Sequence, residues 1–311
     1  MHLPTFSPGR LIGAAAVACA AALIPVASFA ATASAVAAAA SAGSPASAAG
    51  RAHPVTAYVG NLSTESVTPI NTATGKAGKP ITVGEGTGPI AITPDGRTAY
   101  VAVDFGCHGM CQGGTVVPVD TATGKAGKAI TVGSYVVGFA VAPDGKVVYA
   151  DIGSGAVVPI RTASNTAGTA ITAGGGQFSQ IAITPDGKTV YVTDPRLGTV
   201  TPISNAAGTA GKPIKVGKDP SYIAITPDGK TAYVANRGSG TVTPVSTATG
   251  KAGKAITVGG DPSAIAITPD GKTAYVANFG SGTVTPISTA SGKAGKPITI
   301  GGSPDCIAIT P

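Results

Sequence analysis

The sequence predicts an all-β protein assembled from one repeated unit. The stretch AITPDGKTAYVAN occurs twice without change, at 224–236 and 266–278, and looser copies begin at Ala91, Ala140 and Ala182. The tyrosine of this motif recurs at steps of 42 or 49 residues, at Tyr58, Tyr100, Tyr149, Tyr191, Tyr233 and Tyr275. Outside the N-terminal region, no stretch has the 3.6-residue apolar period of an amphipathic helix. A fixed period in this range is typical of solenoids, propellers and arrays, in which each unit packs against its neighbours.

One copy of the unit, 263–302, gives the order of the elements. AIAIT is the first strand (A) and PDGK is a turn, because Pro presets φ, Asp tolerates the second position and Gly supplies a positive φ. TAYVAN is the second strand (B), and the loop FGSG leads to TVTPIST, the third strand (C). The loop ASGKAGK leads to PITIG, the fourth strand (D). Short β-branched runs between Gly-rich breaks therefore predict four antiparallel strands per unit.

Each C strand contains a proline, which cannot donate a hydrogen bond to a neighbouring strand. These residues are Pro69, Pro118, Pro159, Pro202, Pro244 and Pro286. Either the C strand bulges at the proline, or the outermost D strand pairs only briefly with it. The sequence leaves both alternatives open.

Repeated units of four short antiparallel strands are typical of the blades of a β-propeller. The runs IAITPDG, AYVAN and GSGTVTPV resemble the YVTN-type β-propeller repeat, a family common in secreted bacterial and archaeal proteins. The resemblance covers residues 54–311. It implies the fold but no particular activity, because most members of the family have none assigned.

The strand count predicts six blades and a closed ring. A strands are expected near residues 90, 139, 181, 223, 265 and 307, and B strands at the six motif tyrosines. The repeated region starts in a B strand, from Val55, and stops in an A strand, at Pro311. We therefore expect the C-terminal A strand to pair with the N-terminal B strand, which would remove two exposed sheet edges.

The N-terminal region has the composition of an export signal. Arg10 precedes a long apolar stretch that ends in small residues, so we predict a signal peptide at 1–30, cleaved after Ala30 or after Ala35. Residues 31–53 are rich in Ala, Ser and Gly and predict a flexible leader before the propeller at 54–311. Two alternatives are an uncleaved anchor and a lipoprotein lipidated at Cys19. The predicted location is secreted, either extracellular or associated with the cell envelope.

Export places the remaining cysteines in an oxidising compartment. Cys107 and Cys111 lie close together in the inserted stretch DFGCHGMCQGG and predict a local disulfide. The alternative is a Cu(I) site formed with His108 and Met110. Cys306 holds an A-strand position where a small buried side chain is expected.

The composition argues against most enzyme classes. The predicted propeller holds one His and two Glu, Glu65 and Glu85, although imidazole is the commonest general base. We therefore predict a monomeric binding module without cofactor or metal, whose ligand is an extracellular protein, peptide or glycan. The alternative is a lactonase-like propeller hydrolase or lyase at the tunnel mouth, with Glu85 as its acidic candidate. Nucleic acid is not expected as a partner, because aromatic residues do not alternate with the basic ones.

The strand directions sort the loops between two faces of the disc. On the face of the B–C and D–A loops, the sequence predicts a ligand site from residues that depart from the repeat. These are Tyr135, Phe178, Phe105, Phe279, Glu85, Gln177 and Asp219. Asp219, Asp261 and Asp305 recur in similar D–A loops and are also expected to form turns.

The opposite face, with the A–B and C–D turns, carries most of the lysines. Its GKAGK loops predict weak multivalent contacts with an anionic cell-wall polymer, although exposed lysines also serve solubility.

Overall fold

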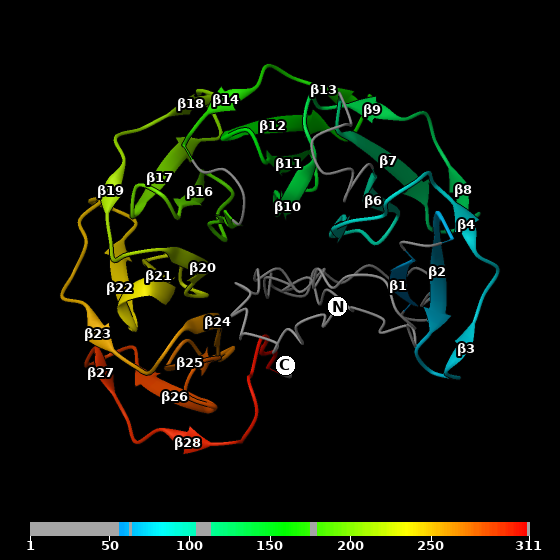
Figure 1. The fold of residues 1–311 in the computed structure, drawn as a ribbon. Coiled ribbons are helices and arrows are strands. Elements are labelled where there is room, and N and C mark those ends of the chain that lie inside the picture. Colours follow the sequence, from blue (N-terminus) through cyan, green and yellow to red (C-terminus); the bar gives the residue numbers. More distant parts are fainter. Residues whose placement is uncertain (1–55, 62–63, 104–112, 175–178, 310–311) are drawn as a thin grey trace, which may run out of the picture.

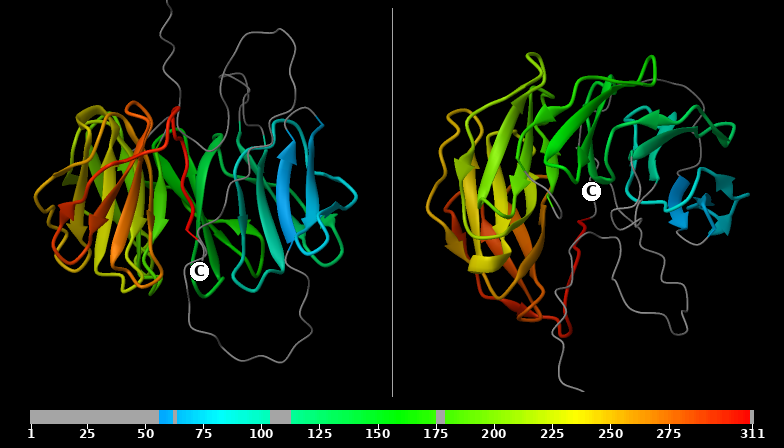
Figure 2. Two further views of the ribbon diagram at one scale, coloured as in Figure 1. Left: turned by 90° about the horizontal axis from the view of Figure 1, so that it is seen from below. Right: turned by 45° about the horizontal axis from the view of Figure 1, so that its top comes forward.

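The computed structural model describes residues 56–61, 64–103, 113–174 and 179–309. These residues form six antiparallel sheets that follow one another around an arc, with the A strands toward the centre and the D strands outermost (Figure 1). The sheets stand side by side at one level, as in a disc (Figure 2). The predicted signal peptide, the leader, Cys107 and Cys111 lie outside the described residues. Within those ranges, no helix is long and apolar enough to cross a membrane.

The sheets are numbered here in chain order, and each contains one copy of the repeat. Sheet 1 contains β1 (Thr56–Asn61), β2 (Ser66–Asn71), β3 (Lys76–Ala77) and β4 (Ile81–Thr82). Sheet 2 contains β5 (Ile90–Ile92), β6 (Thr98–Val103), β7 (Thr115–Asp120), β8 (Lys125–Ala126) and β9 (Ile130–Thr131). Sheet 3 contains β10 (Val136–Val141), β11 (Val147–Ile152), β12 (Ala156–Arg161), β13 (Thr166–Ala167) and β14 (Ile171–Thr172).

The remaining sheets repeat the pattern. Sheet 4 contains β15 (Ile181–Ile183), β16 (Thr189–Asp194), β17 (Thr199–Ser204), β18 (Thr209–Ala210) and β19 (Ile214–Lys215). Sheet 5 contains β20 (Pro220–Ile225), β21 (Thr231–Asn236), the 3₁₀ turn η1 (Arg237–Ser239), β22 (Thr241–Ser246) and β23 (Ile256–Thr257). Sheet 6 contains β24 (Pro262–Ile267), β25 (Thr273–Asn278), β26 (Thr283–Ser288), β27 (Lys293–Ala294) and β28 (Ile298–Thr299).

The pairing of the D strand decides between the two alternatives for the C-strand prolines, a bulged C strand or a briefly paired D strand. The B and C strands pair without interruption, and the motif tyrosine stands opposite the proline, as Tyr233 does opposite Pro244. Next to the proline, the D strand of each sheet is reduced to short pieces. In sheet 5, the N–H of Gly253 donates to the Pro244 carbonyl at 2.7 Å. The C strand therefore does not bulge, and the D strand pairs only briefly.

The PDG turns form as the sequence predicts. In sheet 5, Thr226 Oγ1 donates to Asp228 Oδ1 at 2.6 Å, and the N–H of Lys230 donates to the same oxygen at 3.0 Å. Gly229 closes the turn with φ 71°, a conformation that other L residues adopt only with strain. The equivalent threonine hydroxyl donates to the carboxylates of Asp95, Asp186 and Asp270 in sheets 2, 4 and 6.

The core lies between the sheets. The cluster between sheets 5 and 6 joins Tyr233, Val242 and Ile256 from one sheet to Ala274 and Val276 from the next. Several tyrosine hydroxyls also cross to the C–D turn of the following sheet. Examples are Tyr58 to the Thr121 carbonyl at 3.3 Å and Tyr100 to Asn165 Oδ1 at 2.7 Å. Each unit therefore buries its apolar surface against its neighbours, as the fixed period predicts.

The expected closure is not seen among the described residues. β1 pairs only with β2, and residues 303–309 form no strand. Ser263 Oγ donates to the Pro304 carbonyl at 2.8 Å, as Ser221 Oγ does to the Pro262 carbonyl, so the segment after sheet 6 keeps the register of the repeat. Cys306 in this segment is exposed. The prediction that it is buried was wrong, because no sheet covers this end of the arc.

Candidate functional site on the loop face

The B–C and D–A loops meet on one face of the disc, called the loop face below. Backbone hydrogen bonds join the two kinds of loop within a sheet. The N–H of Gly153 donates to the Tyr135 carbonyl, that of Arg237 to the Asp219 carbonyl and that of Phe279 to the Asp261 carbonyl, at 2.8–2.9 Å. The shared face that the strand directions predict is therefore present.

The predicted site residues are spread over this face. Glu85 precedes sheet 2, Tyr135 precedes sheet 3, Asp219 precedes sheet 5 and Phe279 follows β25 in sheet 6. Glu85 is exposed, and the other three are half-buried. Phe105, Gln177 and Phe178 lie outside the described residues. The structure thus places four of the seven on one face but in different sheets.

Tyr135 is partly a packing residue. Its ring lies against Gly153 so closely that a side chain at that position would collide with the tyrosine Cζ. The glycine in the B–C loop of sheet 3 is what allows the ring to lie there. The packing of the Tyr135 ring therefore connects the D–A loop of sheet 3 with its B–C loop.

Asp219 and Asp261 are turn-formers, as expected. Both have positive φ values, 51° and 50°, which Asp tolerates better than most residues. Their carbonyls hold the following B–C loops through the bonds described above. Because the backbone conformation alone explains an Asp here, these two carboxylates are weak candidates for catalysis.

Asp305 differs from its counterparts in the repeat. It occupies the place that Ser221 and Ser263 hold in the A strands β20 and β24. Its carboxyl is half-buried. Desolvation raises its pKa, and the positive charge of Arg237 from sheet 5 opposes part of that rise. A carboxyl and a guanidinium from different repeats thus lie close enough on the loop face for the charge of one to influence the pKa of the other.

Asp151 is a second exception to the repeat, and the sequence analysis missed it. It lies in β11, where three other repeats have Ala102, Ala235 and Ala277 and two have Gly60 and Thr193, and it is completely buried. Ser179 Oγ from the next sheet donates to Asp151 Oδ2 at 2.7 Å, whereas Oδ1 has no hydrogen-bond partner among the described residues. Burial raises the pKa of this carboxyl to about 7. An acid in place of alanine within a B strand was the signal that could have found it.

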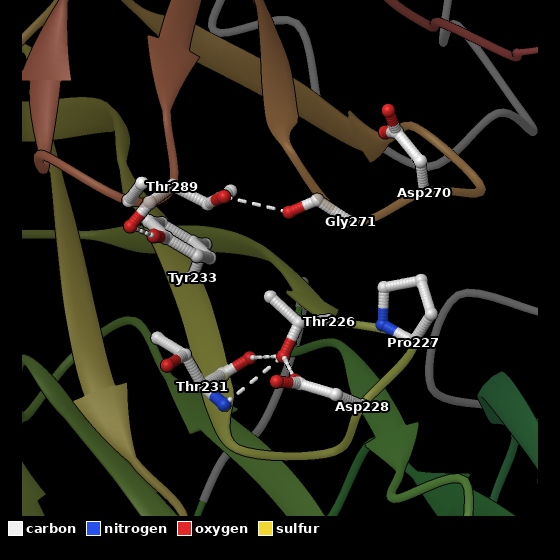
Figure 3. Close-up of a pocket in the computed structure, with 9 residues that line it drawn as sticks. Thr226, Pro227, Asp228, Thr231, Tyr233, Asp270, Gly271 and Thr289 are labelled. Atoms are coloured by element: carbon white, nitrogen blue, oxygen red, sulfur yellow. Dashed lines mark hydrogen bonds between the residues drawn. The ribbon is translucent and has the colours of Figure 1, made fainter.

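The opposite face, called the hairpin face, has grooves between neighbouring PDG turns. The larger groove, of about 380 Å³, lies between sheets 5 and 6 and is lined by Thr226, Pro227, Asp228, Tyr233, Asp270, Gly271 and Thr289 (Figure 3). Its threonines and aspartates are already engaged in the hydrogen bonds that form the turns. A groove of about 280 Å³ between sheets 3 and 4 has equivalent lining residues, including Asp144 and Asp186. Most of the residues that line these grooves recur in every repeat, but Asn205 in the smaller groove stands where sheets 5 and 6 have Thr247 and Thr289.

Potential metal ligands do not converge in the described ranges. No group of three or more His, Cys, Asp or Glu side chains is placed there to hold an ion.

Comparison with known proteins supports the architecture. Residues 199–300, a third of the chain, match the family model described as lactonase, 7-bladed beta-propeller. No curated protein matches the chain. Hydrazine synthase of Kuenenia stuttgartiensis is 23% identical, with a TM-score of 0.65 over 81% of this chain and 85% of that chain. The fold is propeller-like.

Two further solved structures have the same likeness. A functionally unknown protein from Desulfotomaculum acetoxidans DSM 771 is 17% identical, with a TM-score of 0.62 over 81% of this chain and 85% of that chain. Dihydro-heme d1 dehydrogenase NirN in complex with DHE is 18% identical, with a TM-score of 0.65 over 83% of this chain and 57% of that chain. At these identities the likeness establishes the fold alone. The propeller architecture is confirmed, whereas the YVTN-type family itself is not.

Proposed function

We propose that this chain is a propeller hydrolase or lyase that acts on a lactone or a related carboxylic ester at the tunnel mouth of the loop face. The observation that carries the proposal is the lactonase family match over 199–300, which spans the C and D strands of sheet 4 and all strands of sheets 5 and 6. This match favours the catalytic alternative over a binding module without activity.

Asp305 and Arg237 are the residues we assign to this activity. A half-buried carboxyl with a raised pKa can exchange a proton nearer neutral pH than an exposed one. The guanidinium beside it can bind a substrate carboxylate or stabilise the negative oxygen that develops during ester cleavage. Glu85 lies on the same face and is the additional acidic candidate.

Hydrolysis of a panel of lactones tests the assignment. We expect the purified protein to open at least one lactone, and Asp305→Asn and Arg237→Gln each to lower kcat/KM by at least tenfold. Asp144→Asn, in an exposed turn of the hairpin face, is the matched control and should keep full activity. Absence of turnover across the panel, or equal losses in all three variants, would contradict the proposal.

Ring closure belongs to the same proposal, because a tunnel mouth needs a complete wall. The two end faces of the arc match each other. Ile298 and Ile300 on sheet 6 are 48% and 54% exposed, whereas their counterparts Ile256 and Val258 on sheet 5 are 9% and 6% exposed. On sheet 1, Ala57 is exposed and Val59 and Ile70 are half-buried, although their counterparts in sheet 6 are fully buried. We therefore propose a six-bladed ring in which residues 305–309 pair with β1.

A binding role for the loop face remains the second candidate. It is supported by the half-buried Tyr135 and Phe279, which depart from the repeat and lie on this face. The proposed ligand is an extracellular protein, peptide or glycan. A pull-down with the mature domain should identify it, and Tyr135→Ala combined with Phe178→Ala should weaken its capture without unfolding the protein. Unchanged capture would move the ligand site elsewhere.

A further inference from the structure

The outer segments of the six sheets form a nearly continuous band of positive charge. An outer segment is defined here as the C–D turn with the D strand, at 71–82, 120–131, 161–172, 204–215, 246–257 and 288–299. Together these segments hold eleven basic residues and one acidic residue, Asp120. The basic residues are Lys76, Lys79, Lys125, Lys128, Arg161, Lys212, Lys215, Lys251, Lys254, Lys293 and Lys296.

The fold arranges these segments end to end. β3, β4, β8, β9, β13, β14, β18 and β19 follow one another around the circumference, and β23, β27 and β28 continue the line (Figure 1). Neighbouring segments also come close. A side chain at Gly124 would lie 3.5 Å from Ile81 Cδ1 of the preceding sheet, and one at Gly250 would lie 3.7 Å from Ile214 Cδ1. Lysines far apart in the sequence are therefore brought into one row.

The row differs from the other lysines of the protein. Lys146, Lys188, Lys230 and Lys272 of the PDG turns each lie 3.4–3.6 Å from an aspartate oxygen of the same turn. The ion pairs found among the described residues involve only these four turn lysines. All nine lysines of the GKAGK and related AGK motifs are exposed. Only sheet 3 interrupts the row, because Thr166 and Thr169 replace the two lysines.

We propose that this lysine row binds a long, linear phosphate polymer that lies along the circumference of the disc. Lysine ammonium groups bind phosphate as point charges, and a polymer that contacts several sheets gains affinity by releasing many counterions. The outer segments contain no aromatic residue on which a base could stack, which favours a polymer without bases over a nucleic acid. This surface is separate from the proposed catalytic face, so either proposal can fail alone.

Polyphosphate binding measured at several salt concentrations tests the lysine row. We expect long-chain inorganic polyphosphate to bind the wild-type protein, and the quadruple variant K251Q/K254Q/K293Q/K296Q to bind at least tenfold more weakly. The slope of log K against log salt should become shallower by about 3 when four phosphate contacts are lost. Tripolyphosphate should bind far more weakly than the long chain, because it cannot reach several sheets.

The matched control is K146Q/K188Q/K230Q/K272Q, which removes the same number of charges from ion-paired lysines. It should change the affinity less than threefold. If both quadruple variants lose the same affinity, net charge explains the binding and the proposal is overturned. The proposal also fails if the wild-type protein does not bind long-chain polyphosphate, or if it binds tripolyphosphate equally well. The affinity for poly(glycerol phosphate), measured in the same experiment, decides whether the protein prefers a phosphodiester wall polymer or free polyphosphate.

Discussion

At the residue scale, the informative positions are those where one copy of the repeat differs from the others. Asp151 is the clearest case, because a carboxyl replaces alanine inside a buried strand and one of its oxygens has no hydrogen-bond partner among the described residues. A buried group of this kind costs stability unless it is protonated. Its presence cannot be explained by the packing that explains the alanines.

Asp151 is expected to make the protein less stable as the pH rises. Its folded pKa, about 7, lies above the ordinary value of 3.8, so the folded state holds the proton more tightly than the unfolded state. The corresponding stabilisation is complete below pH 3.8 and is lost as the pH rises to about 7, with an upper limit of about 4 kcal/mol. Asp151→Asn should therefore be more stable than wild type at pH 8, and the difference should shrink toward pH 4 in chemical denaturation.

Asp270→Asn is the control for this experiment. The Thr268 hydroxyl, and then the Lys272 backbone N–H, lower the pKa of Asp270, so its stabilisation is present above the ordinary pKa and is lost as the pH falls. This variant should show no gain in stability at pH 8. A stability difference between Asp151→Asn and wild type that is the same at every pH would contradict the role given to the buried carboxyl.

The cysteines outside the described residues give a second prediction at this scale. Cys107 and Cys111 are expected to form a disulfide in the exported protein, because export exposes a closely spaced thiol pair to oxidation. Mass spectrometry after thiol blocking should find both cysteines unmodified until the protein is reduced. Alkylation of both without reduction would instead favour the copper site.

At the element scale, the PDG hairpin should depend on its glycine. Gly271 has φ 69°, and a Cβ there would also approach Pro227 Cδ at 3.4 Å. We expect Gly271→Ala to destabilise the protein by about 1–2 kcal/mol, the cost of a left-handed conformation for an L residue. Lys272→Ala, at the exposed next position, should cost less than half as much in the same denaturation experiment.

The sequence was sufficient for the elements because turn chemistry and alternation are local properties. The four strands and the PDG turns could both be read from one copy of the repeat. The broken D strand could only be stated as one of two alternatives, because its pairing depends on which side of the C strand the proline faces. The environments of Asp151 and Cys306 depend on the neighbouring sheet or its absence, which a single repeat does not encode.

At the scale of the whole molecule, closure of the ring decides how the two end faces behave. If sheet 1 covers sheet 6 in solution, Ile298→Lys should destabilise the protein about as much as Ile256→Lys, by roughly 3 kcal/mol or more, because both bury a charge. An open arc would leave Ile298→Lys within about 0.5 kcal/mol of wild type. Denaturation midpoints of the two variants, measured together, distinguish a closed ring from an open one.

The divided outer strand also bears on self-association. A long D strand would present a straight row of free amide and carbonyl groups, which is the template on which sheets of different molecules join into fibres. Each C-strand proline lacks the amide that would pair with the middle of the D strand, and the two-residue pieces on either side are too short to align a foreign strand. A protein with six nearly identical, β-branched sheets can therefore stay dispersed at high concentration, because every outer edge is interrupted at its midpoint.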